Sequence, residues 1–242
     1  MHPAQDVACA PPLRGGRVAF FGGSFDPPHM GHLAVARAAR EALDLDAVLF
    51  APVGLQPLKP RGATAGFEDR LRMTQLAVAG EPGFEVSLID APRPGNAPNY
   101  TLESLQRLRS ELPAAAELFC LMGADSFFAL RSWHRAAEIP FAAALIVASR
   151  PGLPLRDLEA ALPAGLTLAG CKACRKSGHE LRRCRLSDAG GRRAPFFLLP
   201  GLHVEISASE VRSQLGAGPR AADLLPPAVR DYIAQHGLYT RA

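Results

Sequence analysis

Short apolar runs and longer amphipathic stretches alternate along most of this chain of 242 residues. Runs rich in Val, Leu, Phe and Ala predict strands, and apolar residues spaced three and four positions apart predict helices. The predicted strands are 17–21, 46–51, 84–89, 117–122, 143–148 and 203–206. The predicted helices are 31–43, 67–80, 101–111, 125–137, 209–215 and 226–236.

The order of these elements predicts the fold class. Each gap between successive strands leaves room for a helix, so the strands are expected to be parallel, with right-handed crossovers. The chain is therefore predicted to be an α/β protein with a doubly wound, Rossmann-like parallel sheet and helices on both faces. In such sheets, ligands bind at the carboxyl ends of the strands.

A segment rich in glycine and histidine follows the first predicted strand: Gly22-Gly23-Ser24-Phe25-Asp26-Pro27-Pro28-His29-Met30-Gly31-His32. The two leading glycines leave no Cβ between the backbone and a ligand. The helix expected from residue 31 directs its unpaired N–H groups and the positive end of its dipole to the same place. The segment predicts a binding site for a nucleoside triphosphate. A Gly-Pro turn with two surface histidines is the alternative, and Asp26 is equally well explained as a turn carboxylate.

A second candidate anion site lies near the other end of the chain, at Ile206-Ser207-Ala208-Ser209-Glu210-Val211-Arg212. Ser207 or Ser209 can cap a helix, and Glu210 adds a carboxylate to its first turn. Arg212 comes one turn after Ser209, so hydroxyls, N–H groups and a guanidinium can meet around an anion. Taken alone, the segment is also explained by an ordinary capped helix.

The two segments resemble the HxGH and ISSTxIR signatures of bacterial nicotinate mononucleotide adenylyltransferases, a family of the nucleotidyltransferase superfamily. Ala208, Ser209 and Val211 stand where the family has Ser, Thr and Ile. Further matches come in the family's order: Asn99-Tyr100-Thr101, Gly123-Ala124-Asp125-Ser126 with Trp133 downstream, Ser149-Arg150-Pro151-Gly152, and the tail from Leu225 to Tyr239. The resemblance covers residues 17–240, except a central piece near 170–195.

The resemblance implies transfer of the adenylyl group of ATP to nicotinate mononucleotide, with Mg²⁺ accompanying ATP. His29, His32 and Arg212 are the expected catalytic residues. The nucleophile is a phosphate that is already anionic, so positioning and charge neutralisation suffice without a general base. The expected ATP-binding residues are Gly22, Gly23, Ser24, Phe25, His29, His32, Gly123, Asp125, Ile206, Ser207, Ser209 and Arg212.

The site for the mononucleotide is expected around Lys59, Tyr100, Thr101, Trp133 and Arg150. A pyridine ring favours an aromatic platform, for which Trp133 is the candidate, with packing in the core as the alternative. Leu58 stands where the family usually has His, which puts that contribution to mononucleotide binding in question. Arg70 matches a recurrent family Arg, but a charge on a helix surface explains it equally well.

The central piece contains Cys171, Cys174, His179 and Cys184, at the spacing of a zinc knuckle. Thiolate and imidazole ligands suit a closed structural Zn²⁺ site, which would give order to this basic segment. The alternative is a disordered basic insertion, and Cys9 and Cys120 are expected to be inert. We expect a disordered tail at 1–16 and a single domain at 17–242, with the insertion at about 170–195.

Composition adds bounds to this interpretation. The net charge of +4 suits anionic substrates, but nucleic-acid binding does not follow from it. No apolar run approaches the roughly 20 residues of a membrane helix, and five cysteines without a secretory signal favour the cytoplasm. Alternative functions are adenylyl transfer to nicotinamide mononucleotide or to pantetheine phosphate, cytidylyl transfer, and nucleic-acid binding through the basic segment. The oligomeric state does not follow from the sequence.

Overall fold

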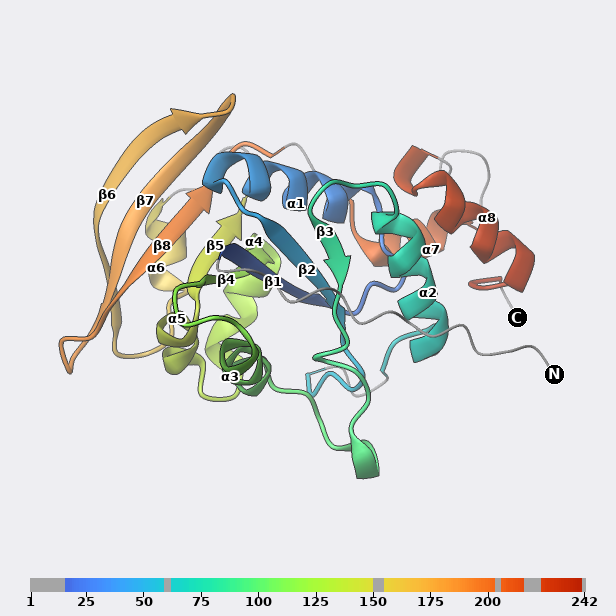
Figure 1. Ribbon diagram of the computed structural model, residues 1–242, viewed down its shortest axis with the longest axis horizontal. Helices are drawn as coiled ribbons and strands as arrows, with labels where there is room; N and C mark the ends of the chain where they lie inside the picture. Colours follow the sequence, from blue (N-terminus) through green and yellow to red (C-terminus); the bar gives the residue numbers. More distant parts are fainter. Residues whose placement is uncertain (1–15, 59–61, 150–154, 203–205, 216–222, 241–242) are drawn as a thin grey trace.

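The computed structural model describes residues 16–58, 62–149, 155–202, 206–215 and 223–240. In this part of the chain, a central sheet has eight strands in the order β3-β2-β1-β4-β5-β8-β7-β6 (Figure 1). The strands are β1 (Arg17–Gly23), β2 (Ala47–Pro52), β3 (Phe84–Val86), β4 (Glu117–Gly123), β5 (Ala144–Ala148), β6 (Leu166–Lys176), β7 (His179–Asp188) and β8 (Arg193–Leu199). The first six strands in this order, which end with β8, are parallel to one another. Strands β7 and β6 continue the sheet as an antiparallel hairpin.

Helices cover both faces of the parallel part of the sheet. They are α1 (Met30–Leu43), α2 (Phe67–Val78), α3 (Thr101–Glu111), α4 (Ala124–Ala129), α5 (Ile139–Ala142), α6 (Leu155–Ala160), α7 (Ala208–Leu215) and α8 (Pro227–His236), with single 3₁₀ turns at Pro94–Asn96, Leu130–Ser132 and Ala136–Glu138. Side chains of α1 pack on one face, and those of α3 to α6 pack on the other. A third apolar cluster joins α2, α7 and α8. In the described part of the chain, no helix combines the length and apolar character needed to cross a membrane.

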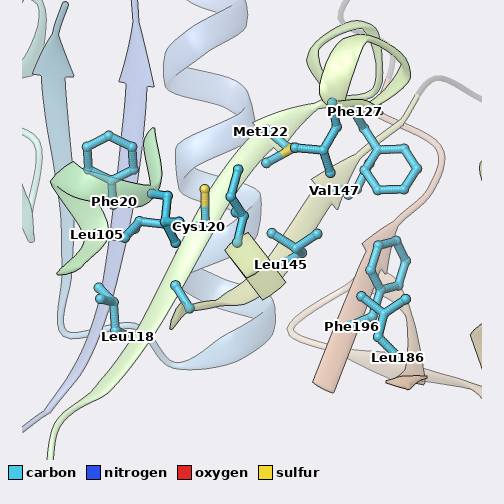
Figure 2. Close-up of a cluster of buried hydrophobic side chains, with 14 of the residues drawn as sticks. Phe20, Leu105, Leu118, Cys120, Met122, Phe127, Leu145, Val147, Leu186 and Phe196 are labelled. Atoms are coloured by element: carbon cyan, nitrogen blue, oxygen red, sulfur yellow. The ribbon is translucent and has the colours of Figure 1, made fainter. Parts of the chain in front are cut away.

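Successive side chains along each strand point to opposite faces of the sheet, as period-2 geometry requires. On the face covered by α3 and α4, Phe20 of β1, Cys120 of β4 and Leu145 of β5 pack with Leu105 and Phe127 (Figure 2). On the opposite face, the intervening residues of the same strands pack against α1. Burial on both faces explains why these strands are apolar runs in the sequence. The predicted α/β fold with a doubly wound parallel sheet is confirmed, with an antiparallel extension that the sequence did not predict.

The predicted strand at 203–206 falls mostly on residues that the structure does not describe. The strand that continues the parallel sheet beside β5 is β8, at Arg193–Leu199, which begins at the end of the segment interpreted as an insertion and extends beyond it. Its apolar run at 196–199 is buried against both clusters. Residues 203–205 lie outside the described part of the chain, and Ile206 is not in a strand.

Two other elements are shorter than predicted. The helix expected at 125–137 ends as α4 at Ala129 and continues as 3₁₀ turns, because Trp133 is extended and Arg135 is left-handed, with φ of 51°. Strand β3 ends at Val86, and the N–H of Ala91 donates to the carbonyl of Leu88 in the turn that follows.

The predicted insertion forms the β6–β7 hairpin, at the left of Figure 1. Ser177 and Gly178 connect the strands with φ of 49° and 83°, the two positive values that a tight hairpin turn requires. Leu181, Cys184 and Leu186 of β7 are buried, so this basic segment contributes to the core. The disordered alternative is therefore wrong. The predicted tail at 1–16 lies outside the described residues, apart from Gly16.

The predicted zinc site is wrong, because the hairpin does not bring its four predicted ligands together around one point. Cys171 and Cys184 form a disulfide between β6 and β7. Cys174 lies opposite Leu181, whose side chain packs on the face of the sheet covered by α1, whereas Cys184 packs on the opposite face. Nε2 of His179 lies 2.8 Å from the carboxylate of Glu41 on α1. No group of three or more potential metal ligands forms among the residues that the structure describes.

Candidate active site

The main pocket of the described structure has a volume of about 770 Å³. It opens at the carboxyl ends of β1 and β4, between which the strand order reverses, as expected for a ligand site in a doubly wound sheet. The starts of α1, α4 and α7 converge on it. The predicted residues that line it are Gly22, Gly23, Ser24, Phe25, His29, His32, Tyr100, Thr101, Gly123, Asp125, Trp133, Ile206, Ser207, Ser209 and Arg212.

The glycines at the end of β1 are required first of all by packing. A Cβ on Gly22 would lie 2.7 Å from the ring of Phe20, and one on Gly23 would lie 3.2 Å from the ring of Phe25. With no side chain at either position, the backbone forms the floor of the pocket. The glycines therefore let this strand end lie close to a ligand.

The two histidines stack at the start of α1, with ring centroids 3.7 Å apart. The backbone N–H of His29 donates to Nδ1 of His32 at 3.2 Å. A neutral His32 that accepts at Nδ1 carries its proton at Nε2, where it is a donor. The contact thus fixes which nitrogen of His32 can donate.

His29 is only 5% exposed. Burial lowers the pKa of its imidazole from 6.5 to about 4, so the ring is neutral at neutral pH. Its Nδ1 has no hydrogen-bond partner among the described residues, and neither has Oγ of Ser149, which also lines the pocket. Because buried polar atoms are normally hydrogen-bonded, these two groups point to a polar ligand.

Helix α7 brings the second predicted anion site to the same pocket. The N–H of Glu210 donates to Oγ of Ser207 at 3.1 Å, so Ser207 is the residue that caps the helix. Arg212 donates to the backbone carbonyl of Asp26 at 2.6 Å and to Oγ of Ser209 at 3.2 Å. Two segments about 180 residues apart in the sequence therefore share one cavity.

Asp26 and Arg70 have buried structural roles that the sequence left undecided. The carboxylate of Asp26 accepts from the N–H groups of Thr64 and Ala65, at 2.6 and 3.0 Å. The guanidinium of Arg70 is buried and donates to the carbonyls of Ser24 and Val53, at 2.7 and 2.9 Å. Arg70 is therefore not a surface charge, and it holds the glycine-rich loop against β2.

The predicted acceptor residues lie on another wall of the pocket. Tyr100 lies at the start of α3, and the centroid of its ring is 4.4 Å from that of the His134 ring. Trp133 both lines the pocket and packs against the cluster of Figure 2, so its packing in the core is confirmed and its role as an aromatic platform stays a prediction. Leu58 also lines the pocket and is 48% exposed. The other two predicted residues, Lys59 and Arg150, lie outside the described part of the chain.

The sequence did not single out Asp90, which lines the pocket and is 5% exposed. The hydroxyl of Ser104 on α3 donates to its carboxyl group, and burial raises its pKa from 3.8 to about 6. The sequence signal that could have identified Asp90 was a carboxylate shortly after the end of a predicted strand. His134 and Gln56 also line the pocket without having been predicted, and Oγ of Ser24 donates to Gln56 at 3.0 Å.

Comparisons with known proteins agree with this site. A family model described as cytidylyltransferase-like matches residues 20–214. A protein of Pelobacter propionicus named "Probable nicotinate-nucleotide adenylyltransferase" is 37% identical over 93% of this chain and 98% of its own length. A protein of the same name from Stenotrophomonas maltophilia is 40% identical over 91% and 95%.

The fold has a similar solved structure. Nicotinic acid mononucleotide adenylyltransferase of Plasmodium falciparum, solved with NaAD, superposes with a TM-score of 0.64 at 16% identity, covering 92% of this chain and 97% of the other. That likeness concerns the fold, whereas the sequence relatives and the family model extend over most of the chain. The chain belongs to the cytidylyltransferase-like nucleotidyltransferases and, within them, to the nicotinate-nucleotide adenylyltransferase family.

Proposed function

We propose that this protein transfers the adenylyl group of ATP to nicotinate mononucleotide, forming nicotinate adenine dinucleotide and pyrophosphate in NAD biosynthesis. The observation that carries the proposal is the convergence of two predicted anion-binding segments, at the starts of α1 and α7, on one pocket. A triphosphate is long enough and charged enough to engage both segments. The aromatic wall around Trp133 then remains for the acceptor.

The reaction needs alignment more than acid–base chemistry. A phosphate oxygen of the mononucleotide attacks the α-phosphorus of ATP, and the bond from this phosphorus to the oxygen bridging to the β-phosphorus breaks. The electron pair of that bond leaves with pyrophosphate. Because the attacking phosphate is an anion at neutral pH, the protein mainly holds the two substrates in line and neutralises the charge that develops on the leaving group.

The two histidines have complementary roles in this proposal. Nε2–H of His32 donates to the triphosphate near the α-phosphate, where charge changes during transfer. Neutral His29 donates a hydrogen bond from its otherwise unpartnered Nδ1 to the same group. Its stacking against His32 orients both rings. Gly22, Gly23 and the following two residues contribute backbone contacts, and Asp125 binds a ribose of the nucleotide.

The β- and γ-phosphates lie at α7 in this proposal. The N–H groups at the start of the helix, the hydroxyls of Ser207 and Ser209 and the guanidinium of Arg212 form a cationic site for the leaving pyrophosphate. A divalent metal such as Mg²⁺ would enter this pocket together with ATP and would supply positive charge to the leaving group.

The acceptor binds at the wall formed by Tyr100, Thr101 and Trp133. The flat pyridine ring stacks on the indole, and its carboxylate faces the N–H groups at the start of α3. Lys59 and Arg150, which lie outside the described residues, remain proposed ligands of the acceptor phosphate. Leu58, in place of the family's usual His, supplies only an apolar contact.

The choice of acceptor is tested by steady-state pyrophosphate release with ATP and each candidate acceptor. We expect a much higher kcat/KM with nicotinate mononucleotide than with nicotinamide mononucleotide, pantetheine phosphate or no acceptor. A preference for the amide would overturn the carboxylate pocket, and a preference for pantetheine phosphate would overturn the aromatic wall as the acceptor site.

A further inference from the structure

The C-terminal end of the chain reaches the back of the pocket through one hydrogen bond. The hydroxyl of Tyr239, three residues after α8, donates to Oδ1 of Asp26 at 2.8 Å. Asp26 and Arg212 both line the pocket, whereas Tyr239 is not among the described residues that do. We propose that Tyr239 is a positioning residue that acts through Asp26 to fix the guanidinium of Arg212 for the phosphates of the nucleotide. This inference rests on the proposed function, which gives Arg212 that ligand.

The carboxylate of Asp26 is held by donors from two directions. Oδ1 accepts from the N–H of Ala65 as well as from Tyr239, and Oδ2 accepts from the N–H of Thr64. Oδ2 also lies 3.6 Å from Nη1 of Arg212. Because both oxygens are engaged, the carboxylate cannot rotate freely, and its negative charge stays directed at Arg212.

Arg212 is held at its inner side and open at its outer side. Nη1 donates to the carbonyl of Asp26, and Nη2 donates to Oγ of Ser209. A guanidinium has five N–H donors in a fixed plane, so further donors remain for a phosphate. Its side chain is 27% exposed, compared with 6% for Asp26. The buried carboxylate of Asp26 thus fixes the orientation in which the partly exposed guanidinium of Arg212 binds its ligand.

The backbone on both sides of the contact is unusual. Tyr239 has φ of 62° and Phe25, next to Asp26, has φ of 46°. Residues other than glycine adopt this left-handed conformation at a cost in free energy, and it persists where the surroundings enforce it, often at functional sites. Burial, together with Asp26, raises the pKa of the Tyr239 phenol, which therefore stays protonated and remains a donor.

The chain offers a matched control for removing this hydroxyl. Tyr232 on α8 donates its hydroxyl to Oδ1 of Asp69 on α2 at 2.9 Å, and neither residue is among those lining the pocket. Tyr239→Phe and Tyr232→Phe each remove one Tyr–Asp hydrogen bond at the C-terminal end. Oδ1 of Asp26 keeps the N–H of Ala65 in the first variant, so the fold is expected to survive.

The test measures the dissociation constant of the ATP analogue α,β-methylene-ATP by calorimetry, with Mg²⁺ present. Tyr239→Phe should weaken binding about three- to tenfold, less than the full contribution of a hydrogen bond to a charged group, because Tyr239 acts on the phosphates only through Asp26. Tyr232→Phe should match wild type. In an Arg212→Ala background, Tyr239→Phe should cause no further loss, because the residue through which it acts is gone. The KM for the mononucleotide should be unchanged in Tyr239→Phe.

Three outcomes would overturn the inference: wild-type affinity in Tyr239→Phe, an equal loss in Tyr232→Phe, or a full additional loss in the Arg212→Ala background. The second of these would show a general effect of the C-terminal helix on stability. Formation of dinucleotide by the wild-type protein is measured separately. A wild type without this activity rejects the proposed function, whereas an active wild type with unchanged affinity in Tyr239→Phe rejects the role of Tyr239 alone.

Discussion

His29 and His32 belong to one short motif but lie in different environments. Nδ1 of His32 accepts from the backbone, which leaves Nε2 as its donor, while buried His29 has an unpartnered Nδ1 and a pKa of about 4. Spacing alone indicated that both rings face the ligand. It could not indicate that one is held neutral by burial and stacked beneath the other, because burial depends on how the rest of the fold packs around the ring.

We predict that His32→Ala lowers kcat by about 10²–10³, because a preorganised donor to developing charge typically contributes that much. Binding of ATP should weaken much less. His179→Ala is the matched control, since this histidine pairs with Glu41 on the hairpin side of α1 and is not among the residues lining the pocket. If His32→Ala kept more than about half of the wild-type kcat, His32 would not contact the transition state.

Asp90 and His29 have opposite effects on stability between about pH 4 and 6. Folding lowers the pKa of His29 from 6.5 to about 4, so in this range the unfolded chain binds a proton that the folded chain does not, and stability falls as the pH drops. Folding raises the pKa of Asp90 from 3.8 to about 6, so the folded chain binds the extra proton and stability rises as the pH drops.

Asp90→Asn should therefore reveal the effect of His29. Between pH 6.5 and 4.5, we expect this variant to lose about 2 kcal/mol more unfolding free energy than wild type does. His29→Gln should show the opposite, a smaller loss than wild type. Urea unfolding at the two pH values measures both differences. Parallel pH profiles in the three proteins would show that neither pKa is shifted in this way.

Trp133→Ala should raise the KM for the mononucleotide about tenfold, within the range for stacking of a base on an aromatic ring. The KM for ATP should change little, and Trp133→Phe should recover most of the loss. Thermal melting gives the contribution of core packing, since Trp133 also packs against the cluster of Figure 2. Equal increases in both KM values would show that the indole acts through the fold and not as a platform.

At the level of elements, the β6–β7 hairpin shows how a local signal can be misassigned. The cysteine and histidine spacing suggested a metal site. In the structure, Ser177-Gly178 is the two-residue turn, and the pair Cys171 and Cys184 is joined across the strands. The buried residues of β7 are Leu181, Cys184 and Leu186, which do not alternate strictly and are separated by arginines, so the sequence carries no clear strand pattern there.

The hairpin turn leads to a prediction of its own. Gly178→Val should lower the unfolding free energy by about 1–2 kcal/mol, because a residue with a Cβ is strained at φ of 83°. Ser177→Asn should be neutral or stabilising, since Asn tolerates the left-handed conformation. Both variants should keep wild-type kcat/KM, as the hairpin is not among the described segments that line the pocket. A loss of activity at unchanged stability would contradict this separation.

At the level of the whole molecule, the sequence predicted the parts that depend on local periodicity. Alternating elements predicted the parallel sheet, and the segments after β1 and at the start of α7 predicted residues on two sides of the pocket. Contacts between distant segments could not be predicted in this way. Asp26 meets Thr64, Arg212 and Tyr239, and Arg70 meets the glycine-rich loop, only because the fold brings them together. The charged side chains of Asp26 and Arg70 are buried, which their residue type argues against.

The fate of labelled ATP tests the central claim most directly, because it shows which bond breaks. The protein is incubated with nicotinate mononucleotide, Mg²⁺ and ATP labelled at either the α- or the γ-phosphorus, and the products are separated by chromatography. We predict that α-label appears in nicotinate adenine dinucleotide and that γ-label appears in pyrophosphate, in equal amounts. Transfer of γ-label to the mononucleotide, or release of pyrophosphate without labelled dinucleotide, would contradict adenylyl transfer by this pocket.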